Sequence, residues 1–265
     1  MDRLRLGTFL APSILPVYQA VADEVGRRLG IETELVVETD HGSYADDAND
    51  VCFICGLPYV EYERRGISPA VPVAAPVLVG ERYAGSPIYF SDVIVACDSP
   101  VRSFTDLRRH TWAYNGPISQ SGYGITRYHL LQLGETKGFF CQTVETGSHA
   151  ASMRRVARHE VDAAAIDSQV LAVALRDDPE LAQSLRVIGT LGPSTIEPVV
   201  VSRRVPVRLR EQITEVLLSM HRDPAVRARL AAGLVERFAA VGASSYDDIR
   251  AMVAACEAAG FMELR

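Results

Sequence analysis

The sequence is poor in several features that define common classes of protein. Lysine and arginine total 27, Lys137 is the single lysine, and the formal net charge at pH 7 is −6. A surface that follows nucleic-acid phosphates needs a basic stripe, so this balance argues against nucleic acid as a partner. No apolar run approaches the ~18 residues of a membrane span, which argues against direct insertion into a membrane.

The cysteines are also few and scattered. There are five, at positions 52, 55, 97, 141 and 256. Cys52 and Cys55 form a CxxC inside the apolar run "DVCFICGLPYV", where alternate residues face opposite sides of a strand. No second Cys/His pair stands at the spacing of zinc ligands. We therefore expect buried apolar thiols, with a redox pair as the alternative, and no metal site.

The N-terminal stretch "MDRLRLGTFLAP" lacks the long apolar segment of a signal peptide. Two localisations stay open at this point. Either the chain remains in the cytoplasm, or an export segment has been removed from it.

Short apolar runs alternate with helical periodicities along most of the chain, which predicts sheets with helices on both faces. The strand patterns fall into two series, and the segments 206–221, 223–239 and 245–259 are expected to be helices. The simplest arrangement has two α/β lobes, 1–90 with 195–265 and 91–194, joined by two crossings of the chain. Ligands in such sheets bind beyond the carboxyl ends of the strands.

One predicted strand end leads into "NGPISQSGYG", residues 115–124, a loop without an ionisable side chain. Ser119, Gln120 and Ser121 stand where the next helix begins. A serine at this position caps the helix, and the first-turn N–H groups are then available to an anion. Gly122 would allow close approach of a ligand to the backbone. An ordinary helix cap is the alternative interpretation.

A second loop repeats this chemistry. "TVETGSHAASMRRV" places Ser148 and His149 directly before another predicted helix. The imidazole can donate a hydrogen bond to an oxyanion. Two such loops in one lobe favour an oxyanion site over a pair of ordinary caps.

Two further side chains are candidates for the same site. Asp167 follows the apolar run "VDAAAI" and would accept from a protonated ligand oxygen or from a ligand ammonium. Its alternative role is the N-cap of the next helix. Tyr59, after "CGLP" in the other lobe, would close on the ligand from the opposite side, or would be a core or surface tyrosine.

The segments "TWAYNGPISQSGY", "TGSHAASMRRVARHEVDAAAIDSQV" and "IGTLGPSTIEPVVVSR" together resemble the phosphate/phosphite/phosphonate substrate-binding proteins of ABC importers. The resemblance extends over essentially the whole chain. It implies a type II periplasmic-binding-protein fold, in which each lobe is a mixed, mostly parallel sheet flanked by helices, with a two-strand hinge.

The resemblance also implies a function and a set of ligand contacts. The protein would be a non-catalytic, monomeric binding protein without a cofactor. It would capture a small oxyanion and, if exported to the periplasm or cell surface, deliver it to an ABC permease. Gln120 stands where relatives often have threonine, so it is expected to set this chain's ligand apart. The implied contacts are Ser119, Gln120, Ser121, Ser148, His149, Asp167, Tyr59 and Tyr44.

Two other functions stay open from the residues. An enzyme on the same fold is disfavoured. The sole lysine, Lys137, lies away from the predicted site, which argues against a pyridoxal-phosphate Schiff base. Ser148 and His149, adjacent on one helix turn, point apart and make a poor nucleophile–base pair. No nucleotide-binding glycine motif is complete. A cytoplasmic ligand sensor fits the missing signal peptide, and it would need a separate partner protein.

Overall fold

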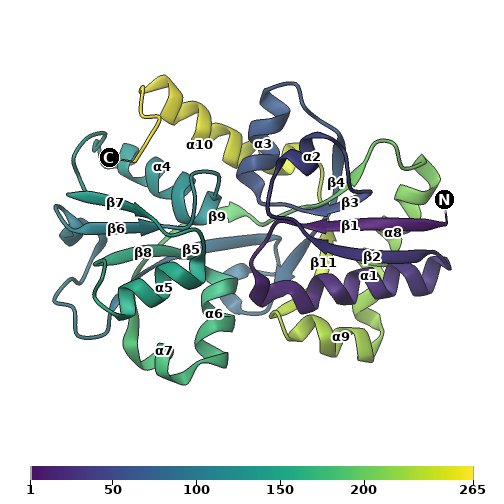
Figure 1. Cartoon of the computed structure of the whole chain (residues 1–265), viewed down its shortest axis with the longest axis horizontal. Coiled ribbons are helices and arrows are strands. Elements are labelled where there is room, and N and C mark those ends of the chain that lie inside the picture. The colour runs from purple at the N-terminus through teal and green to yellow at the C-terminus, as the bar shows by residue number, and fades with distance from the viewer. Residues whose placement is uncertain (1, 265) are drawn as a thin grey trace. The chain divides into compact units, whose positions relative to one another are not determined.

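The computed structural model describes residues 2–264, which divide into two compact units. The first unit contains the chain up to Ile88 together with Thr195–Asp247, and the second contains Tyr89–Ser194 together with the chain from Asp248 onward. Each unit is built on one sheet with helices on both faces (Figure 1). The predicted α/β fold of two mixed sheets flanked by helices is confirmed.

The first sheet has six strands in the order β11-β4-β10-β3-β1-β2. β1 pairs in parallel with β2 and β3, whereas β10 pairs antiparallel with β3 and β4, and β11 antiparallel with β4. Three pairings are antiparallel and two are parallel, so the expectation of a mostly parallel sheet is wrong for this unit. The reason is that the strands of the returning chain run against the first series. The strands are β1 (Arg3–Thr8), β2 (Glu32–Val37), β3 (Val51–Phe53), β4 (Ala70–Leu78), β10 (Val199–Ser202) and β11 (Val235–Ala240).

Helices cover both faces of this sheet. In Figure 1, α2 and α3 lie on one face and α1 and α9 on the other. The apolar side of α1 is buried, with Val17, Val21 and Val25 in the core, as the 3.6-residue period requires. The helices are α1 (Leu15–Leu29), α2 (Gly42–Ala45), α3 (Gly56–Arg64), α8 (Val207–Ser219) and α9 (Pro224–Ala231).

The second sheet has five strands in the order β7-β6-β8-β5-β9. β6 lies between β7 and β8 and is parallel to both, and β5 pairs antiparallel with β8. Trp112 of β6 is fully buried and stacks on Phe140 with ring centroids 4.8 Å apart. The strands are β5 (Ile88–Ala96), β6 (Thr111–Tyr114), β7 (Gln142–Glu145), β8 (Ala163–Asp167) and β9 (Leu185–Thr195).

Helices again cover this second sheet. Five α-helices belong to the described part of this unit, and a π-helical turn, η4 (Gln120–Gly124), leads into the first of them. They are α4 (Ile125–Gln132), α5 (His149–Ala157), α6 (Ser168–Asp177), α7 (Pro179–Ser184) and α10 (Asp247–Ala258).

The C-terminal segment was predicted to pack on the first lobe, but from Asp248 onward it belongs to the second unit. Phe261 and Leu264 are buried in the apolar cluster around Trp112. Arg127 of α4 donates from Nη1 to the Met262 carbonyl at 2.6 Å, and the Leu264 N–H donates to the Tyr123 hydroxyl at 3.2 Å. The chain therefore crosses between units a third time, at Asp247–Asp248.

The predicted helix over 223–239 is wrong in its second half. Helix α9 ends at Ala231, and Val235–Ala240 form β11 against β4. Leu234 has a φ of 58°, which a helix does not accommodate. The sheet edge at β4 offers backbone hydrogen bonds that outweigh the helical tendency of the alanines, so tertiary pairing decides the conformation.

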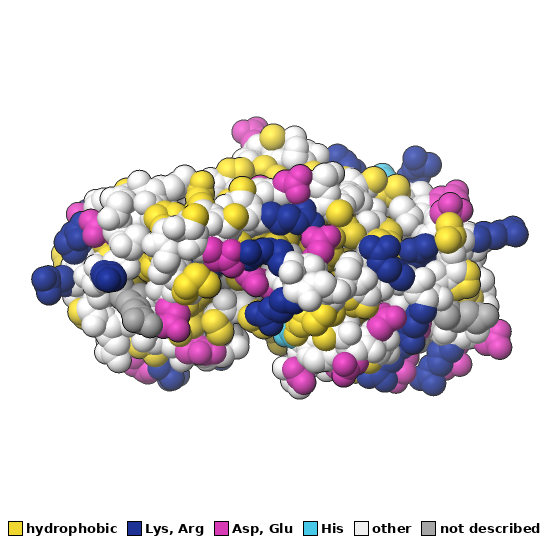
Figure 2. All heavy atoms as spheres, turned by 90° about the horizontal axis from the view of Figure 1, so that it is seen from above, with side chains coloured by type: hydrophobic (Ala, Val, Ile, Leu, Met, Phe, Trp, Pro, Cys, Tyr) yellow, Lys and Arg dark blue, Asp and Glu magenta, His cyan; other side chains and the backbone are white. Residues whose placement is uncertain are grey.

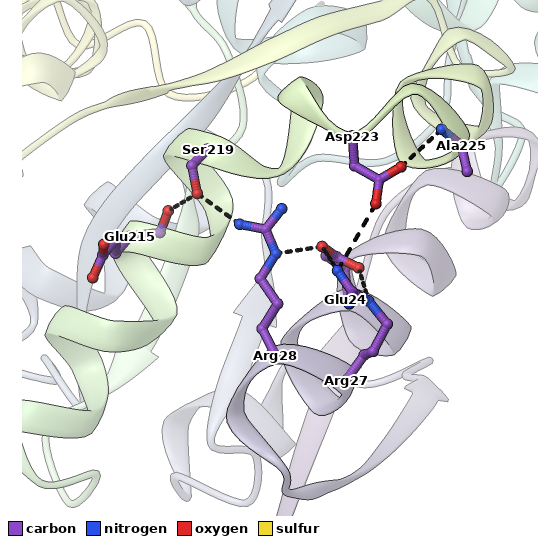
Figure 3. Close-up of polar contacts among 7 residues, drawn as sticks. All are labelled: Glu24, Arg27, Arg28, Glu215, Ser219, Asp223 and Ala225. Atoms are coloured by element: carbon purple, nitrogen blue, oxygen red, sulfur yellow. Dashed lines mark hydrogen bonds and ion pairs between the residues drawn. The ribbon is translucent and has the colours of Figure 1, made fainter.

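A buried carboxylate joins three helices of the first unit (Figure 3). The side chain of Glu24 in α1 is 3% exposed and accepts from the Arg27 Nε at 2.8 Å and from the Arg28 Nε. Arg28 also donates to the Ser219 hydroxyl of α8 at 2.8 Å, and Arg27 lies 3.9 Å from Asp223 at the start of α9. The hydrogen bonds from Arg27 chiefly hold the pKa of Glu24 below its ordinary value.

We expect Glu24→Gln to lower the free energy of unfolding by about 1–3 kcal/mol at neutral pH, because the three charge-assisted hydrogen bonds that Glu24 accepts, two from Arg27 and one from Arg28, are weakened. A carboxyl with a lowered folded-state pKa stabilises the fold above its unfolded pKa, near 4.5, and loses that contribution as the pH falls through the folded value. The variant should therefore lose less stability on acidification. Urea unfolding at about pH 7 and about pH 3 measures both effects.

Glu34→Gln provides the matched control for this prediction. The Glu34 side chain is 42% exposed and pairs with Arg3 at 2.8 Å on the surface, where such pairs contribute about 0–1 kcal/mol. A stability loss in Glu34→Gln as large as that in Glu24→Gln would contradict the role given to the buried carboxylate.

The surface carries charges of both signs. On the face drawn in Figure 2, Arg and Lys side chains are interspersed with Asp and Glu. Within residues 2–264, no helix is long and apolar enough to cross a membrane. The five cysteines are free thiols. Burial raises the pKa of Cys52, which keeps this thiol protonated and unreactive, in line with the expected buried thiol.

Candidate functional site

Three loops of the second unit meet at one edge of its sheet. The strands β6, β7 and β8 are parallel neighbours, so their carboxyl ends lie on the same side. η4 and α4 follow β6, α5 follows β7, and α6 follows β8. The predicted polar residues of this lobe stand in these three connections.

The first connection is the serine loop after β6. The Ser119 hydroxyl oxygen accepts from the Gly122 N–H at 3.0 Å and caps η4. Residues 120–124 are buried. The Tyr123 and Gly124 N–H groups donate to the Ser119 carbonyl at 3.2 and 2.9 Å, and this first turn carries the positive end of the helix dipole. The Ser119 O–H hydrogen stays available as a donor, since the oxygen acts here as an acceptor.

The second connection has the same construction. The Ser148 hydroxyl oxygen accepts from the Ala151 N–H at 3.1 Å and caps α5. Thr146 fixes the approach to this cap, because its hydroxyl donates to the Tyr114 carbonyl at 3.0 Å and contacts the Ser152 hydroxyl at 2.6 Å. Both predicted caps are therefore present at the two helix starts.

A direct side-chain contact joins the two loops. The Ser121 hydroxyl lies 3.1 Å from the Nε2 of His149, the first residue of α5. The His149 residue is 8% exposed, and burial lowers its pKa to about 4. The imidazole is therefore neutral at physiological pH. Two helix N-termini, two cap hydroxyls and a neutral imidazole make a cluster of hydrogen-bond donors without a fixed charge.

The buried imidazole predicts a specific pH dependence of stability. With a folded-state pKa of about 4 and an unfolded value near 6.5, the unfolded chain binds more protons between these values, so stability falls as the pH drops through this window. From about pH 7 to about pH 5 the loss due to His149 is about 2 kcal/mol. Denaturant unfolding measures this loss, and the free energy of unfolding of His149→Gln should fall less over the same pH range because the variant has no imidazole to protonate. If the free energy of unfolding varies with pH in the same way in the wild type and in His149→Gln, the prediction is wrong.

Asp167 occupies the third connection as the N-cap of α6. Its Oδ1 accepts from the Gln169 N–H at 2.7 Å and from the Val170 N–H at 3.1 Å. The residue is buried. The capping role that the sequence offered as an alternative is thus real, and one carboxylate oxygen is sufficient for it.

Gln120 was expected to set the ligand apart through its long amide. The structure places this residue at 1% exposure, with its Nε2 donating to the Ser194 hydroxyl at 3.1 Å and to the Met252 sulfur at 3.3 Å. The side chain therefore links the serine loop to β9 and α10 inside the second unit.

Asn115 is a residue of this site that the sequence prediction did not single out. It follows β6 directly, and its Nδ2 lies 3.4 Å from His149 Nε2. Its Oδ1 lies 2.0 Å from the position of a Cβ on Gly122. The space beside Gly122 is thus filled by Asn115, whereas the sequence prediction reserved it for a ligand.

The two predicted tyrosines belong to the first unit and are buried there. The Tyr59 ring packs on Tyr246 with centroids 5.2 Å apart. The Tyr44 ring packs against Tyr62 with ring centroids 5.5 Å apart, and burial raises the pKa of the Tyr44 hydroxyl. Both side chains lie within aromatic clusters of their own unit.

A concave surface of the first unit has a different lining. A groove of about 620 Å³ runs along α8 and carries carboxylates, which repel an anion, beside its arginines. Among residues 2–264, no group of three or more histidine, cysteine or acidic residues could hold a metal ion. The groove is lined by Val71, Val73, Val207, Arg210, Glu211, Thr214, Glu215, Leu218, Ser219 and Arg222.

Comparison with known proteins identifies the family. Residues 10–246 match the profile of the family described as "ABC transporter, phosphonate, periplasmic substrate-binding protein". This match covers most of the chain, and the protein belongs to that family. The resemblance on the sequence segments around the two loops is thereby confirmed.

The sequence of one relative agrees with this assignment. The phosphonates-binding periplasmic protein of Escherichia coli (strain K12) is 26% identical over 151 residues, which are 55% of this chain and 44% of that protein. The matched region thus spans less than half of that relative's length.

Two solved structures share the fold. The binding protein component of an ABC phosphonate transporter from Pseudomonas aeruginosa superimposes with a TM-score of 0.82 at 18% identity, over 95% of this chain and 85% of that one. PhnD1 from Prochlorococcus marinus (MIT 9301), in complex with methylphosphonate, superimposes with a TM-score of 0.84 at 17% identity, over 97% of this chain and 98% of that one. At this identity the likeness concerns the fold, a two-lobed type II periplasmic-binding-protein fold.

Proposed function

We propose that the protein captures a small phosphonate-type oxyanion at the carboxyl ends of β6, β7 and β8 and delivers it to an ABC permease. The single observation that carries this proposal is the contact of 3.1 Å between Ser121 and His149, which joins two capped helix N-termini into one cluster of donors. Helix N-termini are suited to anions because their N–H groups lack partners and their dipoles favour negative charge.

Each predicted contact has a role in this proposal. The hydroxyls of Ser119, Ser121 and Ser148, the imidazole of His149 and the backbone N–H of Gln120 donate to the ligand oxygens. Asp167 accepts from a protonated oxygen or from an ammonium group of the ligand. Tyr59 and Tyr44 stay as predicted contacts from the first unit. Binding is reversible and without turnover, in a periplasmic, monomeric protein.

Calorimetric titration tests the ligand class. We expect saturable binding of at least one of methylphosphonate, 2-aminoethylphosphonate, phosphite and phosphate, with the ligand recovered unchanged by phosphorus NMR. A protein that binds none of the four would contradict the proposal. Conversion of a bound ligand would favour an enzyme on the same fold.

Asp167 should decide between phosphonates and sulfonates. Methanesulfonate has the shape of methylphosphonate but no protonated oxygen near neutral pH, so the Asp167 carboxylate repels it. Asp167→Asn removes the charge and retains an N-cap side chain. We expect this variant to bind methanesulfonate roughly tenfold more tightly than the wild type, a change of about 1.4 kcal/mol. Parallel titrations measure it, and Asp178→Asn, at the N-cap of α7, is the control.

A further inference from the structure

Asn115 lies between the two residues that define the oxyanion cluster. Its Nδ2 faces His149 Nε2 at 3.4 Å, and its Oδ1 fills the space beside the Gly122 Cα. Gly122 is the glycine that makes this position possible, because a Cβ there would overlap the amide oxygen. The amide is therefore held in place by the backbone of η4.

The amide limits the protonation of the ring. Side-chain amide nitrogen is a donor only, so the Nε2 that faces it must offer a lone pair. A neutral imidazole with an acceptor Nε2 carries its proton on Nδ1. The Nδ1 of His149 is buried, and it has no hydrogen-bond partner within the described residues. The ring thus has an unused donor at the first residue of α5.

The Ser121 hydroxyl competes for the same ring nitrogen, at 3.1 Å. Nε2 has one lone pair, and either Ser121 or Asn115 can satisfy it. When Asn115 does so, the Ser121 hydrogen is free to turn towards another acceptor without leaving the buried nitrogen unsatisfied, which would otherwise be unfavourable.

We propose that Asn115 is a positioning residue that holds His149 in the Nδ1-protonated tautomer and frees the Ser121 hydroxyl to donate to the ligand. The part about the ligand rests on the proposed function. The part about the tautomer concerns the protein without ligand and is independent of it.

Nitrogen NMR of the histidine ring tests the tautomer directly. In ligand-free protein labelled at histidine, we expect His149, assigned by loss of its signals in His149→Gln, to show a protonated Nδ1 and an unprotonated Nε2. Asn115→Asp places an acceptor opposite Nε2 and should move the proton to that nitrogen. In Asn115→Ala, which also serves if the Asp variant does not fold, both tautomers should be populated.

Titration with methylphosphonate tests the consequence for binding. We expect Asn115→Ala to weaken binding about tenfold, the effect of one hydrogen bond, and Asn115→Asp to weaken it further because the new carboxylate repels the anion. Gln132→Glu adds the same charge on the exposed end of α4 and should leave affinity and tautomer unchanged.

Two results would overturn the proposal. One is a protonated Nε2 in the ligand-free wild type, which means that Asn115 presents its oxygen to the ring. The other is unchanged tautomer and affinity in Asn115→Ala. If the wild type binds none of the phosphorus oxyanions, the proposed function fails, while the spectra of ligand-free protein still decide the tautomer.

Discussion

Replacing Ser121 and His149 together by alanine is expected to weaken methylphosphonate binding by about 10²–10⁴-fold. Each side chain provides one hydrogen bond to a charged ligand, and such bonds contribute about 1.5–3 kcal/mol each. The two groups belong to different loops and meet at 3.1 Å, so their loss disrupts both sides of the cluster. Isothermal titration calorimetry measures the affinity, and circular dichroism with thermal melting checks that the variant folds.

A control variant replaces the same two residue types, one serine and one histidine, at positions outside the proposed site. Ser184→Ala with His110→Ala removes a serine at the end of α7 and a histidine directly before β6. His110 lies at the amino end of that strand, opposite to the proposed site, so this control should bind like the wild type within about twofold. Equal losses in the two double variants would show that the Ser121–His149 pair has no special role.

Gly122→Ala is expected to damage both stability and binding. The new Cβ would lie 2.0 Å from Asn115 Oδ1, so the amide must move, and overpacking of this kind costs about 1–3 kcal/mol. Without the amide, the Ser121 hydroxyl must satisfy His149 Nε2 and is no longer free to donate to the ligand. Together with the distortion of η4, this should lower the affinity for methylphosphonate about 100-fold. Chemical denaturation and calorimetry on the same preparations measure the two effects.

The same loop offers a matched control. A Cβ on Gly116 would have only Glu145 Oε1 near it, at 3.9 Å, so Gly116→Ala should change stability by no more than about 0.5 kcal/mol. If Gly122→Ala is as well tolerated as Gly116→Ala, the tight packing of Asn115 against η4 is not what fixes this loop.

The sequence was sufficient to predict the parts of the fold that local patterns encode. The strands at "TWAY", "QTVE" and "AAAID" each lead into a capped helix, and both apolar runs and caps are visible within a few residues. The segment 235–240 was misassigned because its pairing partner, β4, is distant in the sequence. The C-terminal segment was placed in the wrong unit for a related reason, since its anchors are Tyr123 and Arg127.

The candidate site shows the same limit at the level of single side chains. Its hydroxyls and its histidine could be found from their positions at predicted helix starts. The orientation of Gln120 towards Ser194 and Met252, and the contact of Asn115 with His149, join residues that are 34 to 132 positions apart. Such contacts depend on how strands order themselves in the sheet, which composition and periodicity do not specify.

Backbone amide NMR during titration with methylphosphonate locates the bound anion residue by residue. We expect the amide signals of Ser121 and Gly122 in η4, and of His149 and Ala150 in α5, to shift together and saturate. The N–H groups of Ser121, His149 and Ala150 would donate to the same anion, and the Gly122 N–H, bonded to the Ser119 hydroxyl, would report the change beside it. Saturable shifts confined to other segments, such as those along the α8 groove, with these four amides unmoved, would contradict the proposed site.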